Sequence, residues 1–479
     1  MKHPLDDLLM EALPPGSLFA VGGRVRDEIR SIAERIPVAS ADLDYVVTGV
    51  SAPSLVAVLE RLGRVNVVGA SFSVVKLQTA VGYADVALPR RERSTGVGHR
   101  DFTVEAGPQI PLEDDLRRRD FRMNMLARSI ATGEVTDPYG GAADIRARRI
   151  DIVTEATFEE DPLRVLRAAQ FAARFEYAVA PRAVRAMRAA APLVASVSAE
   201  RIGAELLKFL VPARRPSLGL WLLRDAGVLD GFWPELSEGV GVEQNEWHAF
   251  DVFRHNLECL DAAPPGDAIS RVAAVLHDVG KPRTKDGPHF YRHEHVGANL
   301  VPAMLDRLRL SNATVTAVAH LVRHHMYAAD PRLEARAIRR FIRRIGVEHL
   351  ERLFALRACD IAGSGLPKRD GENELFEAKV RAILAERPAF TVRDLAVDGS
   401  DILDLLGVAG TSGGRRGDPR VGSVLAQLFE RVTDEPELNQ RKTLLALAKT
   451  IVPDAARMNA ARDDRAFKDG ARPSEIGER

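Results

Sequence analysis

The chain changes character near residue 150, and this change constrains the fold more than any other feature. Before that point, short β-like runs such as SLFAVGG (17–23) and YADVALP (83–89) alternate with helical stretches. After it, apolar residues recur at spacings of three and four, with Pro, Asp or Ser near the start of each run. The pattern predicts an α+β fold: an N-terminal head with a small β-sheet and helices, followed by an all-α remainder.

Length, charge and cysteine content narrow the class of protein. A chain of 479 residues is too long for one core, and domain sizes predict about three or four domains. The formal net charge is zero, so overall charge does not indicate a nucleic-acid partner. Two cysteines, Cys259 and Cys359, exclude a disulfide framework, and we interpret them as buried bystanders. The acidic N-terminus and the lack of a long apolar run predict a cytoplasmic protein without a membrane span.

Two glycines, Gly22 and Gly23, follow the first β-like run and precede a helical stretch that carries Arg26 and Asp27. A Gly–Gly turn allows a ligand to approach the backbone closely, and the free N–H groups of a helix N-terminus attract anions. The turn therefore predicts a phosphate site, although a plain turn is the commoner meaning of this pattern.

Carboxylates at Asp42 and Asp44 stand two residues apart at the start of the run DYVV. Alternation along a strand would point both to one side, about 6 to 7 Å apart, which suits a pair of Mg²⁺ ions. Asp85 stands on a later β-like run and would complete the cluster. A solvated strand edge is the alternative for an isolated Asp-x-Asp.

Five segments in this order resemble the bacterial tRNA nucleotidyltransferase and poly(A) polymerase superfamily, specifically the class II CCA-adding enzymes. They are GGRVRD (22–27), DLDYVV (42–47), DLRRRDFRMNMLA (115–127), DPYGGAADIRARRI (137–150) and EEDPLRVLRAAQFAARF (159–175). The resemblance implies template-independent addition of CCA to tRNA 3′ ends from CTP and ATP, with Mg²⁺ at the transferase site. It also implies contacts of the tRNA acceptor arm with the helical part.

The last segment carries Asp161, Arg164 and Arg167 three residues apart, on nearly one helix face, with Asp161 expected as N-cap. Cytosine and adenine share an amino donor beside a ring-nitrogen acceptor, so a carboxylate and an arginine would accept both and reject U and G. The resemblance implies this role for Asp161 and Arg164.

The remaining assignments in the head also come from the resemblance. It implies that Arg119, Asp120 and Asn124 contact the ribose and triphosphate, and that Gly22, Gly23 and Arg26 form the phosphate turn. Arg122, Met123 and Met125 depart from the expected Thr, Ile and Ala. The segment 89–102 is predicted to be a mobile loop that assists the switch from C to A addition, with an inert surface loop as the alternative.

A second group of residues lies in the helical part and resembles the HD phosphohydrolase superfamily. Imidazoles with carboxylates bind divalent transition metals such as Ni²⁺ or Mn²⁺. The resemblance implies phosphatase and 2′,3′-cyclic phosphodiesterase activity toward RNA ends. The ordered set is His255, His277, Asp278 and Asp360, and His293, His295, His324 and His325 are candidates for a second metal or for phosphate contacts.

We therefore expect four domains: the nucleotidyltransferase head (1–150), a neck for nucleotide selection and RNA binding (151–215), the HD body (216–395) and a helical tail (396–479). The alternatives are a poly(A) polymerase, an enzyme that adds only A or only CC, and an RNA-binding protein with a dead site. The intact Asp42 and Arg164 disfavour the last of these. The sequence does not fix the oligomeric state and is compatible with a homo-oligomer.

Overall fold

The computed structural model describes residues 3–37, 42–68, 74–94, 102–367, 371–386, 388–406 and 418–451. The chain forms two compact units. The first contains the described residues up to Arg323 together with Ala358–Leu366, and the second contains His324–Arg357 and the described residues from Pro367 onward. The expected C-terminal tail beyond residue 451 and residues 95–101 of the expected loop lie outside the described residues.

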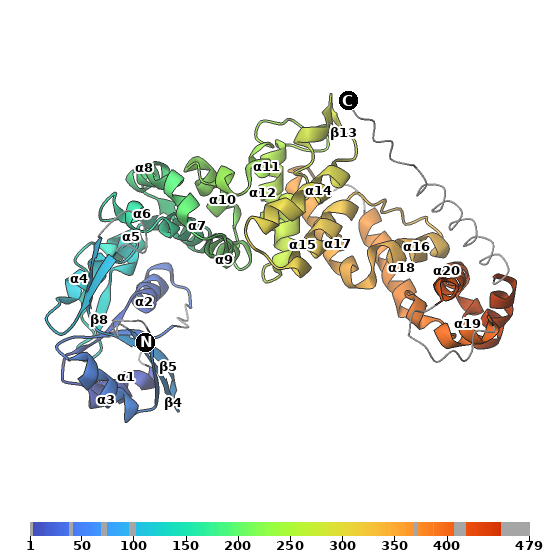
Figure 1. Ribbon diagram of the computed structural model, residues 1–479. Coiled ribbons are helices and arrows are strands. Elements are labelled where there is room, and N and C mark those ends of the chain that lie inside the picture. The colour runs from blue at the N-terminus through green and yellow to red at the C-terminus, as the bar shows by residue number, and fades with distance from the viewer. Residues whose placement is uncertain are drawn as a thin grey trace, which may run out of the picture. The chain divides into compact units, whose positions relative to one another are not determined.

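A mixed sheet forms the centre of the N-terminal head (Figure 1), with strand order β3-β4-β5-β2-β1-β8-β9. Its strands are β1 (Leu18–Val21), β2 (Asp44–Val47), β3 (Arg64–Val68), β4 (Val74–Thr79), β5 (Gly82–Ala87), β8 (Ala127–Ser129) and β9 (Val135–Thr136). Neighbouring strands are antiparallel except β2 and β5, which are parallel and pair Asp44 with Asp85. This one parallel pair brings two of the predicted carboxylates side by side.

Short helices accompany the sheet. They are α1 (Pro4–Ala12), α2 (Gly23–Glu34), α3 (Ala52–Glu60), α4 (Leu112–Arg117) and α5 (Gly141–Arg146). The ends of the predicted mobile loop are ordered as a separate antiparallel pair, β6 (Arg90–Ser94) with β7 (Phe102–Ala106). The segment is therefore in part a hairpin, which its Gly, Ser and Thr content did not indicate.

A buried ion pair fixes α1 and α2 to the strand that carries Asp44. The Arg24 guanidinium donates to both carboxylate oxygens of Asp6, at 2.8 and 2.6 Å, and the Tyr45 hydroxyl donates to the same carboxylate at 2.6 Å. Burial would raise the pKa of Asp6, but these donors and the backbone N–H of His3 lower it to about 2. The start of α2 and the start of β2 are thereby held together.

The rest of the first unit is helical, as the pattern of apolar residues predicted. Its helices are α6 (Thr157–Glu160), α7 (Leu163–Phe175), α8 (Pro181–Ala190), α9 (Ala199–Leu210), α10 (Ser217–Asp225), α11 (Pro234–Ser237), α12 (Val252–Ala262), α13 (Ala268–Leu276), α14 (His293–Asp306) and α15 (Asn312–His324). Helix α7 packs against α9 and α10. Two pairs of two-residue strands interrupt the helices: β10 (Arg149–Ile150) with β11 (Ala178–Val179), and β12 (Lys285–Asp286) with β13 (His289–Phe290). The sequence did not indicate them, because strands this short leave no periodicity.

The second unit has its own apolar core, in which Ile402, Leu428 and Leu444 are fully buried. Its helices include α16 (Ala335–Ile345), α18 (Glu372–Ala385), α19 (Gly399–Leu405) and α20 (Pro419–Asp434), and α17 (Val347–Gly363) supplies residues to both units. Arginines of α16 pair with acidic residues of α20: Arg340 lies 2.9 Å from Asp434, and Arg343 pairs with Glu430. None of the helices within the described ranges is long and apolar enough to cross a membrane.

Candidate functional site

The first candidate site lies at the end of β1 and the start of β2, beside the start of α2, with Asp85 of β5 next to it. The parallel register places Asp44 next to Asp85, and Asp42 is an exposed residue just before β2 rather than part of the strand. Burial raises the pKa of Asp44, and the neighbouring carboxylates of Asp85 and Asp42 raise it further, while Arg119 opposes the rise. Three neighbouring carboxylates offer the negative charge and the oxygen ligands that a divalent cation needs.

The Gly–Gly turn faces this cluster. Gly22 has φ +65° and ψ −129°, a backbone conformation that suits glycine. A Cβ added there would lie 2.8 Å from Nη1 of Arg119 and 3.8 Å from Oδ2 of Asp44. The turn, the arginine and the carboxylate therefore meet at one point. Nη2 of Arg119 also donates to Oδ2 of Asp115 at 3.1 Å, which fixes the direction of the guanidinium group.

Arg26 points away from that point and into the interior. Its Nη1 donates to Oδ1 of Asn124 at 2.8 Å, and its other nitrogens pair with Asp27 at 2.8 and 3.0 Å. The guanidinium group lies over the rings of Phe171 and Phe175, 5.2 and 4.8 Å from their centroids. Arg26 thus ties the turn to helix α7.

Asp120 and Asn124 continue this interior network. Nδ2 of Asn124 donates to Oδ1 of Asp120 at 2.8 Å, and Nε of Arg167 donates to Oδ2 of Asp120 at the same distance. Burial alone would raise the pKa of Asp120, but Arg167 and Asn124 hold it below its usual range. Both residues are buried, so the structure places them behind the site, and their contact with the ribose or triphosphate stays a prediction.

The start of helix α7 carries the predicted base-reading residues. The helix begins at Leu163, and Oδ1 of Asp161 accepts the N–H of Leu163 at 3.2 Å, so Asp161 caps the helix from one position further back than predicted. Arg164 donates to the carbonyl oxygens of Thr157 at 3.1 Å and Arg118 at 2.7 Å, and pairs with Glu160. These carbonyls fix the direction of the guanidinium group.

The residues that depart from the family pattern lie in well-packed positions. Nε of Arg122 lies 3.0 Å from Oδ2 of Asp144, and Oδ1 of the same carboxylate accepts from Nε of Arg149 at 2.9 Å. Met123 and Met125 are buried in the core. Arg122 and Arg149 thus pair with the same buried carboxylate, that of Asp144.

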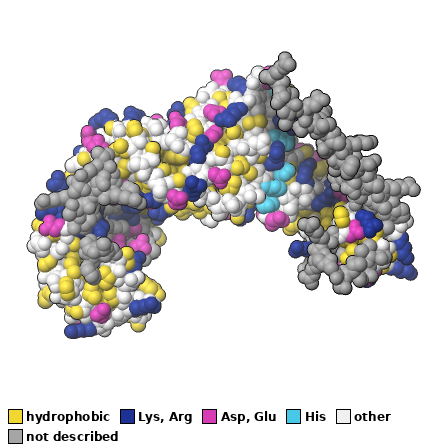
Figure 2. Space-filling model, in the orientation of Figure 1, with side chains coloured by type: hydrophobic (Ala, Val, Ile, Leu, Met, Phe, Trp, Pro, Cys, Tyr) yellow, Lys and Arg dark blue, Asp and Glu magenta, His cyan; other side chains and the backbone are white. Residues whose placement is uncertain are grey.

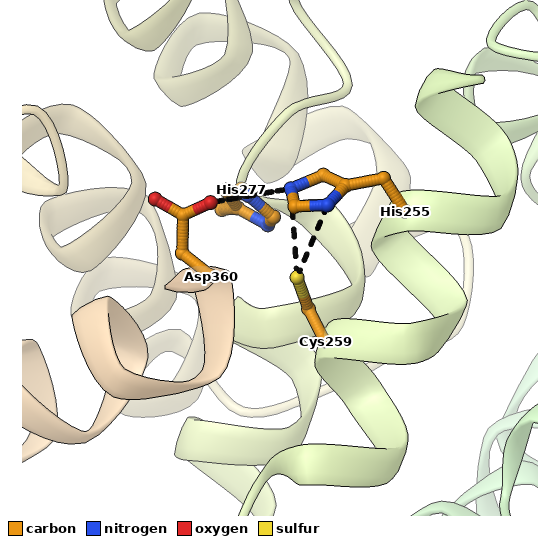
Figure 3. Close-up of side chains that lie close together, drawn as sticks. All are labelled: His255, Cys259, His277 and Asp360. Atoms are coloured by element: carbon orange, nitrogen blue, oxygen red, sulfur yellow. Dashed lines mark hydrogen bonds and ion pairs between the residues drawn. The ribbon is translucent and has the colours of Figure 1, made fainter. Parts of the chain in front are cut away.

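A second candidate site joins α12, the end of α13 and α17 within the first unit. Nε2 of His255 lies 3.2 Å from Nε2 of His277, 3.4 Å from Oδ2 of Asp278 and 3.3 Å from Oδ1 of Asp360. All four predicted residues therefore meet, and Figure 3 shows His255, His277 and Asp360 directed toward one another.

The orientation of the rings fits a metal ion. Nδ1 of His255 faces the carbonyl oxygen of Gly363 at 3.1 Å, and Nδ1 of His277 faces that of Ala274 at 2.9 Å. Because a carbonyl only accepts, each Nδ1 carries a proton, and in the neutral ring each Nε2 presents its lone pair to the cluster. Burial would lower the pKa of His277, but the carboxylates of Asp278 and Asp360 raise it to about 10. The site thus stabilises a positive charge at this point.

Several residues around this site were not predicted to belong to it. Cys259 is buried, as expected, but its Sγ packs on the ring of His255, 3.5 Å from Nε2 (Figure 3). The spacing of four residues from His255 on one helix was the available signal. Lys281 lies 2.5 Å from Oδ2 of Asp278, and the ring of His248 packs edge-on against His255 with centroids 4.6 Å apart.

The additional candidate histidines have different surroundings. Nε2 of His293 lies 3.2 Å from Oδ1 of Asp278, with its Nδ1 facing the carbonyl of Phe290 at 2.8 Å, so His293 borders the cluster. His295 lies 3.5 Å from Glu294. His324 and His325 belong to the second compact unit.

Comparison with known families finds three matches along the chain. Residues 18–151 match the Poly A polymerase head domain, residues 176–239 match the probable RNA and SrmB-binding site of polymerase A, and residues 256–359 match the HD domain.

Curated relatives match most of the chain. A protein named "Multifunctional CCA protein" from Xanthomonas campestris pv. campestris (strain B100) is 35% identical over 404 residues, which cover 80% of this chain and 93% of that protein. A similar "Multifunctional CCA protein" comes from Cupriavidus metallidurans, at 36% identity over 73% of this chain and 84% of that protein. The "A-adding tRNA nucleotidyltransferase" of Deinococcus radiodurans is 36% identical over 87% of this chain and 91% of that protein.

Solved structures show the same fold. The Bacillus stearothermophilus CCA-adding enzyme in complex with CTP superimposes with a TM-score of 0.60 at 23% identity and covers 94% of both chains. The Thermotoga maritima CCA-adding enzyme complexed with tRNA superimposes with a TM-score of 0.51 at 17% identity and covers 90% of both chains.

Proposed function

The chain belongs to the family of multifunctional CCA proteins, and from this premise we propose how its two sites act. It is a tRNA nucleotidyltransferase that adds CCA to tRNA 3′ ends from CTP and ATP without a template, and its HD domain is a phosphohydrolase for RNA ends. The observation that carries the transferase function is the meeting of Gly22, Arg119, Asp44 and Asp85 at one point.

At the transferase site, Asp42, Asp44 and Asp85 offer the hard oxygen ligands that Mg²⁺ prefers. When bound, the metal pair supplies activation of the attacking hydroxyl and charge stabilisation of the pyrophosphate that leaves. The absence of a side chain at Gly22 and Gly23 allows the triphosphate to lie against the backbone at the start of α2. Arg119, which lies against Gly22, adds a positive charge beside these phosphates.

Nucleotide selection is assigned to the start of α7. The Asp161 carboxylate accepts from the amino group shared by cytosine and adenine, and the Arg164 guanidinium donates to the ring nitrogen. U and G present the opposite donor and acceptor pattern, and the mismatch costs about 1 to 3 kcal/mol for each bidentate pair. Support comes from the two carbonyl contacts that fix the guanidinium group of Arg164.

At the HD site, His255, His277, Asp278 and Asp360 would hold a divalent transition metal such as Ni²⁺ or Mn²⁺. The bound metal supplies a water of lowered pKa for attack on a phosphate ester. The chain's own residues keep the imidazoles in the binding tautomer through the carbonyls of Gly363 and Ala274. The substrates we propose are terminal phosphates and 2′,3′-cyclic phosphates of RNA ends.

The helical part is assigned to the tRNA acceptor arm, which it would bind by shape and phosphate contacts. We assign the head to residues 1–150, the neck to 151–215, the HD body to 216–395 and the tail to 396–479, and the protein to the cytoplasm. Binding should weaken steeply as salt rises.

Restriction to A addition is the second candidate function. The Deinococcus radiodurans relative that matches 87% of this chain bears the name of an A-adding enzyme, so sequence similarity fits both activities. The segment 89–102, which we expect to assist the switch between nucleotides, does not separate them.

Incorporation of each labelled NTP with Mg²⁺ tests the assignment. Three tRNA transcripts are used, ending at the discriminator base, after C and after CC, and products are resolved to single nucleotides. Growth by CCA from CTP and ATP alone, followed by a stop, is the expected result. Extension of only the CC-ended transcript would establish the A-adding function, and a long A ladder would establish a poly(A) polymerase. No incorporation would refute the transferase function.

A further inference from the structure

A half-exposed tryptophan borders the HD site. The side chain of Trp247 is 50% exposed to solvent. It directly precedes His248, whose ring packs against the proposed metal ligand His255. Removing the apolar surface of an indole from water is favourable, so a ligand that covers this ring would gain binding free energy.

A second exposed aromatic group lies on the opposite segment. Tyr291 is 65% exposed and stacks on the exposed ring of His289, with centroids 5.2 Å apart and an interplanar angle of 29°. It stands two residues before His293, whose Nε2 lies 3.2 Å from Asp278. Trp247 and Tyr291 therefore stand one and two residues from His248 and His293, which contact the proposed metal ligands His255 and Asp278.

Two lysines join these segments. Nζ of Lys281 lies 2.5 Å from Oδ2 of Asp278 and donates to Oε1 of Gln244 at 2.7 Å. Nζ of Lys285, in β12, donates to the carbonyl oxygen of Glu243 at 2.8 Å. The segment that carries Trp247 and the hairpin that leads to Tyr291 are thus fastened together, and we call Trp247, His289 and Tyr291 the aromatic rim. Figure 2 shows histidine side chains gathered in one area of the surface beside Lys and Arg.

We propose that the aromatic rim is a stacking surface for the unpaired bases of the RNA end whose phosphate enters the HD site. This inference rests on the phosphohydrolase function proposed above, and it adds the surface that would make the HD site prefer phosphates attached to an unpaired nucleotide. A metal site recognises only the phosphate, whereas a base has two π faces that an exposed aromatic ring can cover. Lys285, which is exposed, provides positive charge for the intervening backbone.

The geometry favours a base over a protein side chain because cations and flat rings occur together at the rim of a phosphate-ester site. Stacking does not read hydrogen-bond patterns, so the rim accepts any base. A single-stranded end is required, because bases inside a duplex have no free faces. The HD site should therefore prefer nucleotides and frayed RNA ends over phosphate esters without a base.

A binding experiment that does not depend on hydrolysis tests the proposal directly. The full chain is titrated with a single-stranded RNA trinucleotide, and tryptophan emission is recorded. We expect quenching that persists in Trp221→Phe, because Trp221 lies on α10, and that is lost in Trp247→Phe. Tyr291→Ala should weaken the affinity about 5- to 150-fold, which corresponds to about 1 to 3 kcal/mol for one stacked base. Quenching that is unchanged in Trp247→Phe would overturn the proposal.

Kinetics separate this proposal from the function on which it rests. The metal-loaded chain is assayed with adenosine 2′,3′-cyclic phosphate and with glycerol phosphate, which lacks a base. We expect Trp247→Ala to raise KM for the nucleotide alone. Tyr83→Ala, which removes another exposed aromatic ring, is the control and should leave KM unchanged for both substrates. An equal loss with both substrates would mean that Trp247 only supports the metal site, and would overturn the stacking role. If neither substrate is hydrolysed by the unmodified chain, the phosphohydrolase function fails, and the quenching experiment still decides the stacking.

Discussion

Gly22→Ala is the substitution that most directly tests the geometry of the transferase site. A new Cβ would lie 2.8 Å from Nη1 of Arg119, so the guanidinium group must move. Two costs follow. An L-residue at φ +65° and ψ −129° carries about 1 to 3 kcal/mol of backbone strain. Displacing the flexible end of Arg119 costs little stability but removes a charged contact with the triphosphate, worth about 1.5 to 3 kcal/mol.

Gly16→Ala is the matched control, because Gly16 also has positive φ (+75°) but nothing lies within 4 Å of its added Cβ. Both variants should therefore lower the thermal midpoint of unfolding. Only Gly22→Ala should lower kcat/KM for incorporation of CTP and ATP, by about 10- to 150-fold, because only it displaces Arg119.

The assay is single-nucleotide extension of a CC-ended transcript over a range of ATP concentrations, with unfolding followed in parallel. Equal activity of the two variants would refute the claim that Arg119 acts at the turn. A loss in Gly22→Ala that Arg119→Ala does not reproduce would show that the backbone itself, and not the arginine, carries the effect.

Three further predictions concern the other charged groups. Asp42→Ala should abolish nucleotide incorporation while hydrolysis of adenosine 2′,3′-cyclic phosphate to the monophosphate continues, and loss of both activities would indicate misfolding. Asp278→Asn should lower the transition-metal content measured by elemental analysis and abolish that hydrolysis, while CCA addition with Mg²⁺ remains; a retained metal would refute the ligand set. Because Asp6 has its pKa lowered from 3.8 to about 2, its ion pair with Arg24 stabilises the fold fully above about pH 5, and this stability, about 2 kcal/mol, is lost as the pH falls toward 2. Asp6→Asn should therefore lower stability at pH 7 and flatten its dependence on pH in that interval, as measured by denaturant unfolding.

Local patterns were sufficient for much of the fold. The Gly–Gly turn, the strand that begins at Asp44 and the helix after Asp161 each depend on residues a few positions apart, so their signals are present in short segments. The predicted start of α7 was wrong by one residue. The Asp161 carboxylate accepts the N–H of Leu163 whether the helix is taken to begin at Pro162 or at Leu163, so the cap does not decide between the two.

Contacts between residues far apart in the sequence were harder to predict. Asp85 was recognised as a candidate, but only the parallel pairing of β2 with β5 places it beside Asp44. The approach of Arg119 to Gly22 and the bond of Arg26 to Asn124 link residues that are about 100 positions apart, and no periodicity records such a pairing. Lys281 and His248 are different, because they stand only three residues from Asp278 and seven from His255, so their places beside the HD site were within reach of the sequence.

The interior network explains why base selection and triphosphate binding must act as one assembly. Arg26 contacts Asn124, Asn124 contacts Asp120, and Asp120 pairs with Arg167 on the helix that carries Asp161. Removing one partner of a buried charge pair leaves an uncompensated charge, which costs about 3 to 5 kcal/mol. A tilt of α7 against the turn would break such pairs, so this network opposes it. The carboxylate that we propose to read the base and the glycines that we propose to receive the phosphates are therefore held at a fixed separation, as a template made of amino acids requires.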